Sequence, residues 1–317
     1  MMLVPATAFL VALAGALVLT PLVRRAAVDA ELLDEPGGRK IHVRAIPRLG
    51  GAAMLVAFGM GVAVGLLASQ LAGHEVEEVT AQLLPVLVGV TLVAGVGLFD
   101  DLQDLRPLAK LAGQVVASVA VVALGLSFTD LATPWFTIQL GIFGPLLTIV
   151  WLVAVANAVN LIDGLDGLAG GVSLATLLAF GGIAANLHAP MVLMVTAGGA
   201  GAVVAFLVHN RPPASIIMGD AGSMLLGMLL GTSAVALVTR TPGHATLPAA
   251  VVALGVPLAD MTWAILRRLA ARRSIFAADS SHIHHQLMLR GLGQGAVTLI
   301  LVAASALLGL LAVVIAR

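Results

Sequence analysis

Two adjacent carboxylates are the residues whose position first suggests chemistry. Asp100 and Asp101 follow directly on the apolar residues 97–99, and Asp104 lies three residues further on. Carboxylates at the edge of an apolar segment repel each other and lose hydration unless a cation balances them. Lys110 lies in the next apolar segment, where it can serve as a charge partner or contact a phosphate. A solvated helix end is the alternative for the acids taken alone.

A second group of polar residues combines amides, carboxylates and glycines in one short stretch: Asn157, Asn160, Asp163, Gly164, Asp166 and Gly167. The two asparagines and the first aspartate recur at every third position, so they lie on one face of a helix end. The two glycines allow a tight turn with exposed backbone N–H groups. An interhelical polar contact is the alternative, but so many polar groups exceed what packing requires.

A third motif, Met218-Gly219-Asp220-Ala221-Gly222-Ser223, opens a long apolar segment. A helix that begins here presents free N–H groups and the positive end of its dipole, which suit a phosphate. Asp220 could simply cap this helix. It could equally be a ligand for Mg²⁺, which favours carboxylates together with substrate phosphates over a closed protein cage.

Three histidines form the fourth group, His282, His284 and His285, in a segment rich in arginine. Their clustering raises the question of zinc, but the chain has no cysteine and its carboxylates suit Mg²⁺ better. We therefore expect phosphate binding or proton transfer from these histidines rather than zinc coordination. The absence of cysteine also excludes disulfides and thiolate nucleophiles.

The elements that must position these motifs are transmembrane helices. Of 317 residues, 60% are hydrophobic and 10% are charged, whereas soluble proteins carry about 25% charged residues. Several apolar segments approach the roughly 20 residues that a spanning helix needs. They are residues 2–23, 49–72, 82–99, 108–126, 140–161, 168–187, 191–209, 217–238, 245–266 and 296–316. We predict an all-α, polytopic helical bundle of about ten transmembrane helices, with residues 1–317 forming a single domain.

Positive charges indicate how this bundle is oriented. With ten spans, 14 of the 16 Lys and Arg residues lie on the side that holds all four motifs. Only Arg240 and Arg317 lie on the other side. The positive-inside rule therefore predicts that the motifs face the cytoplasm and that both termini lie outside. The formal net charge is zero, so bulk charge indicates no nucleic-acid partner.

Together the motifs place acids, amides and bases at one membrane face. This combination suits diphosphate chemistry on a lipid acceptor, because Mg²⁺ and cationic side chains neutralise a transferring phosphoryl group while carboxylates hold the metal. A transporter for a nucleotide sugar or organic anion is the alternative from another class, since intramembrane acids also mark ion pathways. The clustering at one face, rather than at the bilayer midplane, disfavours it.

Over residues 34–291, the sequence resembles the polyprenyl-phosphate N-acetylhexosamine-1-phosphate transferases. The motifs that carry the resemblance are Arg39-Lys40-x-His42 with Pro47-x-x-Gly50-Gly51, Asp100-Asp101-x-x-Asp104-Leu105-x-Pro107-x-x-Lys110-Leu111-x-x-Gln114, Asn157-x-x-Asn160-x-x-Asp163-Gly164-x-Asp166-Gly167-Leu168, Met218-Gly219-Asp220-x-Gly222-Ser223 and His282-x-His284-His285. An ordered series of this kind in a polytopic protein is not expected by chance.

The resemblance implies transfer of a sugar 1-phosphate from a UDP-sugar to a membrane polyprenyl (undecaprenyl) phosphate, with release of UMP. This would be the first membrane step of cell-envelope polysaccharide synthesis, carried out by a multi-pass protein of the plasma (inner) membrane. The resemblance also implies dependence on Mg²⁺, with Mn²⁺ as an alternative metal. A homodimer is compatible with it.

Within the family, the Arg39-Lys40-Ile41-His42 and His282-Ile283-His284-His285 forms are similar to the branch that uses UDP-N-acetylglucosamine, the WecA and TagO type. The alternative within the family is the MraY translocase of peptidoglycan synthesis, which takes UDP-N-acetylmuramoyl-pentapeptide.

From the same resemblance we expect roles for individual residues. Asp100 would assist deprotonation of the attacking phosphate, Asp220 would hold Mg²⁺, and Asp101 would support the metal or the base. His284 and His285 would act at the phosphates. The remaining residues expected to contact nucleotide, sugar or phosphates are Lys40, His42, Lys110, Asn157, Asn160, Asp163, Gly164, Asp166, Gly219 and His282. A two-step route with a carboxylate nucleophile is the mechanistic alternative.

Overall fold

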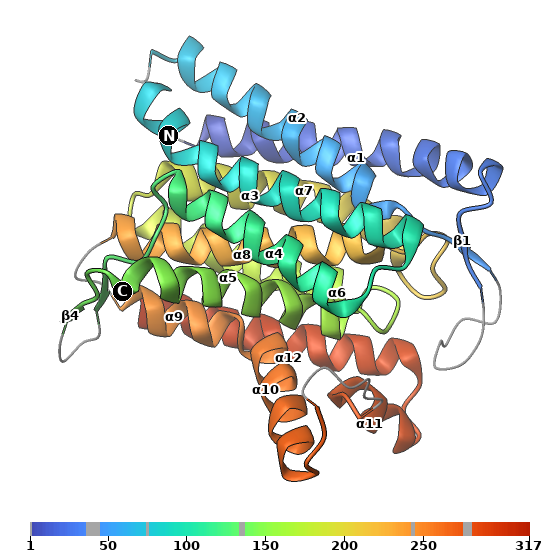
Figure 1. Ribbon diagram of the computed structural model, residues 1–317. Helices are drawn as coiled ribbons and strands as arrows, with labels where there is room; N and C mark the ends of the chain where they lie inside the picture. Colours follow the sequence, from blue (N-terminus) through green and yellow to red (C-terminus); the bar gives the residue numbers. More distant parts are fainter. Residues whose placement is uncertain (1, 36–44, 74–75, 133–136, 242–244, 275–280) are drawn as a thin grey trace.

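The computed structural model describes all residues except 1, 36–44, 74–75, 133–136, 242–244 and 275–280 (Figure 1). Its helices are α1 (Leu3–Asp29), α2 (Gly50–Leu71), α3 (Val76–Gln103), α4 (Pro107–Ala123), α5 (Phe143–Ile162), α6 (Leu168–Asn186), α7 (Pro190–Asn210), α8 (Gly219–Arg240), α9 (Thr246–Ala253), α10 (Gly255–Ala270), α11 (Ile283–Leu289) and α12 (Gln294–Ile315). There are also four short strands in two antiparallel pairs: β1 (Leu33–Asp34) pairs with β2 (Ile46–Pro47), and β3 (Asp130–Ala132) pairs with β4 (Thr137–Gln139). The predicted all-α class is confirmed.

Every apolar segment predicted from the sequence coincides with helix. Among the described residues, eight helices are long and apolar enough to span a membrane: α1, α2, α3, α5, α6, α7, α8 and α12. The pair α9 and α10 adds a ninth span only if both are counted together, because a bend of 74° separates them. The remaining predicted span, α4, is apolar but has only 17 residues. The polytopic membrane bundle is thus confirmed, with eight or nine spans by length and composition.

Local sequence features explain why two of the predicted spans are not regular transmembrane helices. Helix α4 starts with Pro107 in its first turn, and Gly125, with φ of +93°, follows its last turn. A first-turn proline and a left-handed glycine are common signals for the start and the end of a helix. Pro257 lies in the first turn of α10, where its missing N–H and its ring prevent an unbroken helix from continuing out of α9.

Helix α8 lies at the centre of the bundle. All residues from Ala221 to Val238 are buried, and the helix packs against α2, α3, α5 and α6. A Cβ at Gly51 of α2 would lie 2.1 Å from the backbone nitrogen of Gly222. A Cβ at Gly97 of α3 would lie 2.5 Å from the backbone nitrogen of Ala221. Glycines therefore let two neighbouring backbones close on the first turn of α8, as small residues do in membrane bundles.

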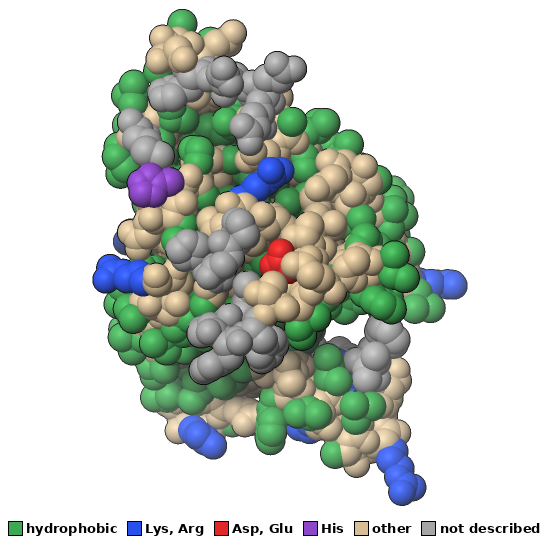
Figure 2. Space-filling model, turned by 90° about the vertical axis from the view of Figure 1, so that its left-hand side faces the viewer, with side chains coloured by type: hydrophobic (Ala, Val, Ile, Leu, Met, Phe, Trp, Pro, Cys, Tyr) green, Lys and Arg blue, Asp and Glu red, His purple; other side chains and the backbone are tan. Residues whose placement is uncertain are grey.

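The predicted motifs gather at one end of the bundle. Helices α3, α5 and α7 end there, and α4, α6 and α8 begin there, on the side where Figure 1 shows β1. Both termini lie at the opposite end (Figure 1). Figure 2 shows that opposite end, where the described surface is mostly apolar or uncharged and only scattered charged side chains are visible. The helices therefore run back and forth between the two ends as the ten-span prediction assumes, and the Lys and Arg residues on each side were counted on that assumption.

Candidate active site

A polar cavity of about 420 Å³ opens at the end of the bundle where the motifs gather. Its lining comes from the ends of α3 and α7, the starts of α4, α8 and α12, the segments that precede α2, α4, α6 and α8, and α11. Carboxylates dominate it: Asp34, Asp100, Asp101, Asp104, Asp163, Asp166 and Asp220. The basic groups in the lining are Arg48, Lys110 and His285. The sequence motifs are therefore brought together around one strongly acidic cavity.

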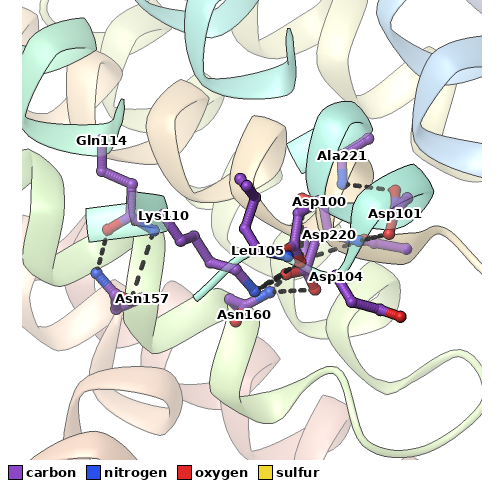
Figure 3. A network of polar contacts seen from close by, with 12 residues as sticks. Asp100, Asp101, Asp104, Leu105, Lys110, Gln114, Asn157, Asn160, Asp220 and Ala221 are labelled. Carbon is purple, nitrogen blue, oxygen red and sulfur yellow. Dashed lines mark hydrogen bonds and ion pairs between the residues drawn. The ribbon is translucent and has the colours of Figure 1, made fainter. Parts of the chain in front are cut away.

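Lys110 and Asp220 form the centre of the cavity (Figure 3). The Lys110 ammonium lies 2.8 Å from Asp100 Oδ2 and also pairs with Asp220 Oδ2. Asn160 Nδ2 donates to Asp220 Oδ1 at 2.9 Å and to Ser223 Oγ at 2.8 Å. Residues from α3, α4, α5 and α8 thus meet at one point. The Asp220 carboxylate is held between a cation and an amide, so its position is fixed before any ligand binds.

Asp101 shapes the first turn of α8. Its Oδ1 accepts a hydrogen bond from the backbone N–H of Asp220 at 2.8 Å, and its Oδ2 accepts one from Ala221 at 3.1 Å. Gly219 has φ of +68°, and a Cβ there would lie 2.5 Å from Asp101 Oδ2. A carboxylate at a helix N-terminus satisfies free N–H groups and complements the helix dipole. The geometry therefore gives Asp101 a supporting role next to Asp220, and its predicted role as a metal ligand stays a prediction.

Arg48 binds the segments around Asp101 together. Its guanidinium donates to the backbone carbonyl of Asp101 at 3.1 Å and lies 3.4 Å from Asp34 and 3.7 Å from Asp104. Arg48 lies at an unspecified position of the motif Pro47-x-x-Gly50-Gly51, so the sequence predicts no role for it. Because these partners lie 14 to 56 residues away in the sequence, only the fold shows that they meet.

Asn157 points away from the cavity. Its Nδ2 donates to Gln114 Oε1 at 2.6 Å and to the carbonyl of Val153 at 2.8 Å (Figure 3). Gln114 is fully buried, and the cavity lining does not include Asn157. This amide pair joins α4 to α5 one turn below Lys110 and Asn160. Asn157 therefore supports the groups above it, and its predicted substrate contact stays a prediction.

The turn between α5 and α6 brings two carboxylates to the cavity. Asp166 Oδ2 accepts a hydrogen bond from the backbone N–H of Ala214 at 3.0 Å, which ties this turn to the α7–α8 loop. Asp163 is half-buried and lines the cavity, and its carboxylate has no hydrogen bond to any described residue. Burial, followed by the carboxylates of Asp220, Asp101 and Asp166, raises the pKa of Asp163 well above its usual value. Asp163 is therefore the acid in this cavity that most needs a cation.

The histidine motif divides into a part that lines the cavity and a buried part. His285 lines the cavity, whereas His284 is 1% exposed and neither of its ring nitrogens has a hydrogen-bond partner among the described residues. A Cβ at Gly164 would lie 2.4 Å from His284 Nε2, so the ring fills the space that this glycine leaves. Burial, followed by His285, lowers the pKa of His284 to about 4. His284 is therefore neutral at physiological pH.

His282 does not reach the cavity. It is buried, and its Nδ1 lies 2.7 Å from Oδ2 of Asp260 on α10. The sequence predicts substrate binding for His282 and no role for Asp260. A lone acid within the apolar residues 245–266 was a usable signal, because an ionisable residue inside a predicted span needs a partner. The predicted contacts of Lys40 and His42 lie outside the described residues.

The cavity fits an oxygen-binding divalent cation. No three His, Asp or Glu side chains converge into a ready metal cluster within the described parts of the chain. Mg²⁺ does not require one, since it is usually bound by one or two carboxylates together with substrate phosphates and water. Asp220, and Asp163, whose carboxylate has no partner among the described residues, are the carboxylates best placed to hold it. The surplus of acids over bases in the lining supports the same conclusion.

Comparisons with known proteins identify relatives over most of the chain. Residues 83–238 match the model of the family described as "Glycosyl transferase family 4". A Bacillus subtilis protein named "Probable undecaprenyl-phosphate N-acetylglucosaminyl 1-phosphate transferase" is 34% identical over 287 residues, which cover 90% of this chain and 77% of that protein. The "Decaprenyl-phosphate N-acetylglucosaminephosphotransferase" of Mycolicibacterium smegmatis is 37% identical over a region that covers 85% of this chain and 71% of that protein. The "Phospho-N-acetylmuramoyl-pentapeptide-transferase" of Streptococcus thermophilus is 32% identical and covers 73% of each chain.

Proposed function

Since this chain belongs to glycosyl transferase family 4, we propose that it transfers N-acetylglucosamine 1-phosphate from UDP-N-acetylglucosamine to a polyprenyl phosphate and releases UMP. The observation that carries the proposal is the group formed by Asp100, Lys110, Asn160 and Asp220 at the end of an apolar bundle. Such a site can receive a water-soluble diphosphate from one side and a lipid phosphate from the membrane.

The proposed reaction is a direct displacement. An oxygen of the polyprenyl phosphate forms a bond to the β-phosphorus of the UDP-sugar. The bond from this phosphorus to the bridging oxygen breaks, and UMP leaves with the electron pair. A proton on the attacking phosphate passes to Asp100. Lys110, 2.8 Å from Asp100, offsets the negative charge that gathers in the transition state.

The metal belongs to the proposal as well. Mg²⁺ held by Asp220 and Asp163 would polarise the diphosphate and neutralise its charge, and Mn²⁺ suits the same oxygen ligands. Asp101 contributes by holding the backbone of Asp220 in place. Exhaustive chelation should abolish turnover, and added Mg²⁺ should restore it. Undiminished turnover after chelation would remove the metal from the mechanism.

Two nucleotide sugars compete as the proposed donor. The Bacillus and mycobacterial relatives are named for N-acetylglucosamine transfer, and the Streptococcus relative is named for the muramoyl-pentapeptide. The higher identity of the former, and the larger share of this chain that they cover, support UDP-N-acetylglucosamine. We also place the cavity at the cytoplasmic face of the plasma membrane, a choice supported by the 14-to-2 distribution of Lys and Arg.

One assay tests this function. Purified protein is incubated with undecaprenyl phosphate and, separately, with UDP-N-acetylglucosamine, UDP-N-acetylgalactosamine, UDP-glucose and UDP-N-acetylmuramoyl-pentapeptide, and UMP release is measured. A preference of about a hundredfold requires only about 2.7 kcal/mol in transition-state binding. We expect UDP-N-acetylglucosamine to be fastest. Faster release from the pentapeptide donor would move the protein to the other branch, and vesicle uptake without UMP release would indicate a transporter.

A further inference from the structure

Asp260 is a buried carboxylate on a helix that leaves the bundle. It lies in α10, just after the 74° bend, and is 4% exposed. It is the only acidic residue of that helix. A buried carboxylate in an apolar helix is costly unless hydrogen bonds compensate it. Its partners therefore show what the residue is for.

Both oxygens of Asp260 bind the start of α11. Oδ2 lies 2.7 Å from His282 Nδ1, and Oδ1 accepts a hydrogen bond from the backbone N–H of Ile283 at 2.7 Å. His282 precedes the first residue of α11, and its own side chain does not cap the helix. One carboxylate thus fixes both the direction of the helix and the orientation of the His282 ring. A carboxylate at Nδ1 also selects the ring form that carries a proton there.

The rings of His282, His284 and His285 connect Asp260 to the cavity. His282 and His284 are stacked, with centroids 5.8 Å apart and planes 6° apart. The His284 and His285 centroids are 4.2 Å apart. His284 fills the space above Gly164, and His285 lines the cavity, whereas Asp260 does not. His282 and His284 are both buried, so the contacts of Asp260 lead through these rings to His285, which lines the cavity.

We propose that Asp260 is a positioning residue for the nucleotide-sugar side of the cavity, acting through His282. The proposal rests on the proposed function, because the histidines would contact the diphosphate of the donor. It assigns the acceptor to a different part of the cavity, around Asp100 and Lys110. Loss of the Asp260 carboxylate therefore weakens binding of the donor and leaves binding of the polyprenyl phosphate unchanged.

The first experiment separates the two substrates. In Asp260→Asn, prepared as the full chain in detergent, the KM for the donor should rise at least tenfold at saturating undecaprenyl phosphate. The KM for undecaprenyl phosphate should stay within twofold. Thr176→Val is a matched control, because the Thr176 hydroxyl donates to the carbonyl of Ala253 at 3.1 Å and so steadies the same broken span without touching the histidines. It should leave both KM values within twofold.

A double-mutant cycle with His282→Gln tests the route of the effect. If Asp260 acts through His282, the double variant is no worse than the poorer single variant, which is the signature of coupled residues. Independent, multiplying effects would overturn the proposal. So would equal changes in both KM values, or a fall in kcat alone.

A readout without turnover keeps the inference separate from the proposed function. In ¹⁵N-histidine spectra of the wild type, His282 should carry its proton on Nδ1, and Asp260→Asn should shift the resonances of His282 and His285. If Asp260→Asn does not fold, the same spectra of His282→Gln should show a shifted His285. An unchanged His285 in both variants would overturn the positioning role. Wild-type protein inactive with every UDP-sugar, but with these shifts present, would refute only the proposed function.

Discussion

Asp220 is the carboxylate on which the other polar groups of the cavity converge. Asp220→Asn keeps the size of the side chain and removes its charge, so among the described residues Lys110 retains only Asp100 as a charged partner. We expect kcat to fall by about a hundredfold to a thousandfold, since the loss of one preorganised electrostatic group commonly costs about 10² to 10³. UMP release and the Tm in detergent are the measurements.

Asp104→Asn is the matched control for this variant. Asp104 also lines the cavity, but its side chain is 92% exposed and its ion pair with Arg48 spans 3.7 Å. Its activity should stay within a few-fold of wild type. Activity of Asp220→Asn within tenfold of wild type would remove Asp220 from the centre of the mechanism.

Gly164 is required by the ring packed against it. In Gly164→Ala the new Cβ would lie 2.4 Å from His284 Nε2, and the buried ring must move. Overpacking of this kind typically costs about 1–3 kcal/mol. We expect a lower Tm and a kcat/KM for the donor reduced at least tenfold. Gly95→Ala, where no atom lies within 4 Å of the new Cβ, should leave kcat/KM within twofold. Equal effects of the two substitutions would contradict the role of this contact.

His284 gives the protein a pH dependence of known sign. Its pKa in the folded protein is about 4, against 6.5 for a free imidazole, so the unfolded chain binds more protons between these values. Stability is therefore lost as the pH falls through this window. His284→Asn lacks the effect, so its Tm should fall less between pH 7 and pH 5 than that of wild type. Parallel Tm losses would show that His284 is not buried in its neutral form.

Sequence reasoning found most residues of the cavity but not their pairings. Asp100, Asp163 and Asp220 were predicted because unneutralised acids next to apolar segments are conspicuous. The hydrogen bonds of Asn157 to Gln114 and of His282 to Asp260 were not predicted. Each depends on how two helices are rotated against each other, and residue spacing within one helix carries no information on that rotation.

At the scale of the element, the start of α8 depends on Asp101. Asp101→Ala frees the backbone N–H groups of Asp220 and Ala221, and loss of a helix cap costs about 0.5–2 kcal/mol. We expect a lower Tm together with at least tenfold slower turnover, because the backbone that carries Asp220 is released. Asp101→Asn, which keeps one oxygen acceptor, should lie between Asp101→Ala and wild type. Wild-type turnover in Asp101→Ala would show that the cap does not position Asp220.

The elements themselves could be predicted from hydropathy, with two limits. Each of the ten apolar segments corresponds to helix, because apolar runs of this length are stable in lipid only when every backbone group is hydrogen-bonded internally. Hydropathy does not register a change of direction, so the bend before Pro257 was read as one straight span. Nor does it resolve where a short helix such as α4 stops, since the residues after Ala123 are also apolar.

At the scale of the whole molecule, the orientation in the membrane is testable because the chain has no cysteine. Single cysteines are introduced as Ser127→Cys, between α4 and α5, and as Ser281→Cys, before α11. With an impermeant thiol reagent and sealed cells, Ser127→Cys should be labelled and Ser281→Cys should be labelled only after lysis. Labelling of Ser281→Cys in intact cells would reverse the orientation.

The burial of α8 has a consequence for how the protein is made. A helix with no residue from Ala221 to Val238 at the surface touches no lipid in the finished bundle, and the helices that it packs against most, α2, α3, α5 and α6, all precede it in the chain. Asp101, Lys110 and Asn160, which hold Asp220, also lie on helices that are made before α8. A growing chain therefore contains these three side chains but no active site until α8 brings Asp220 between them. Activity arises only when α8 has entered the bundle, so earlier biogenesis intermediates are silent toward both substrates.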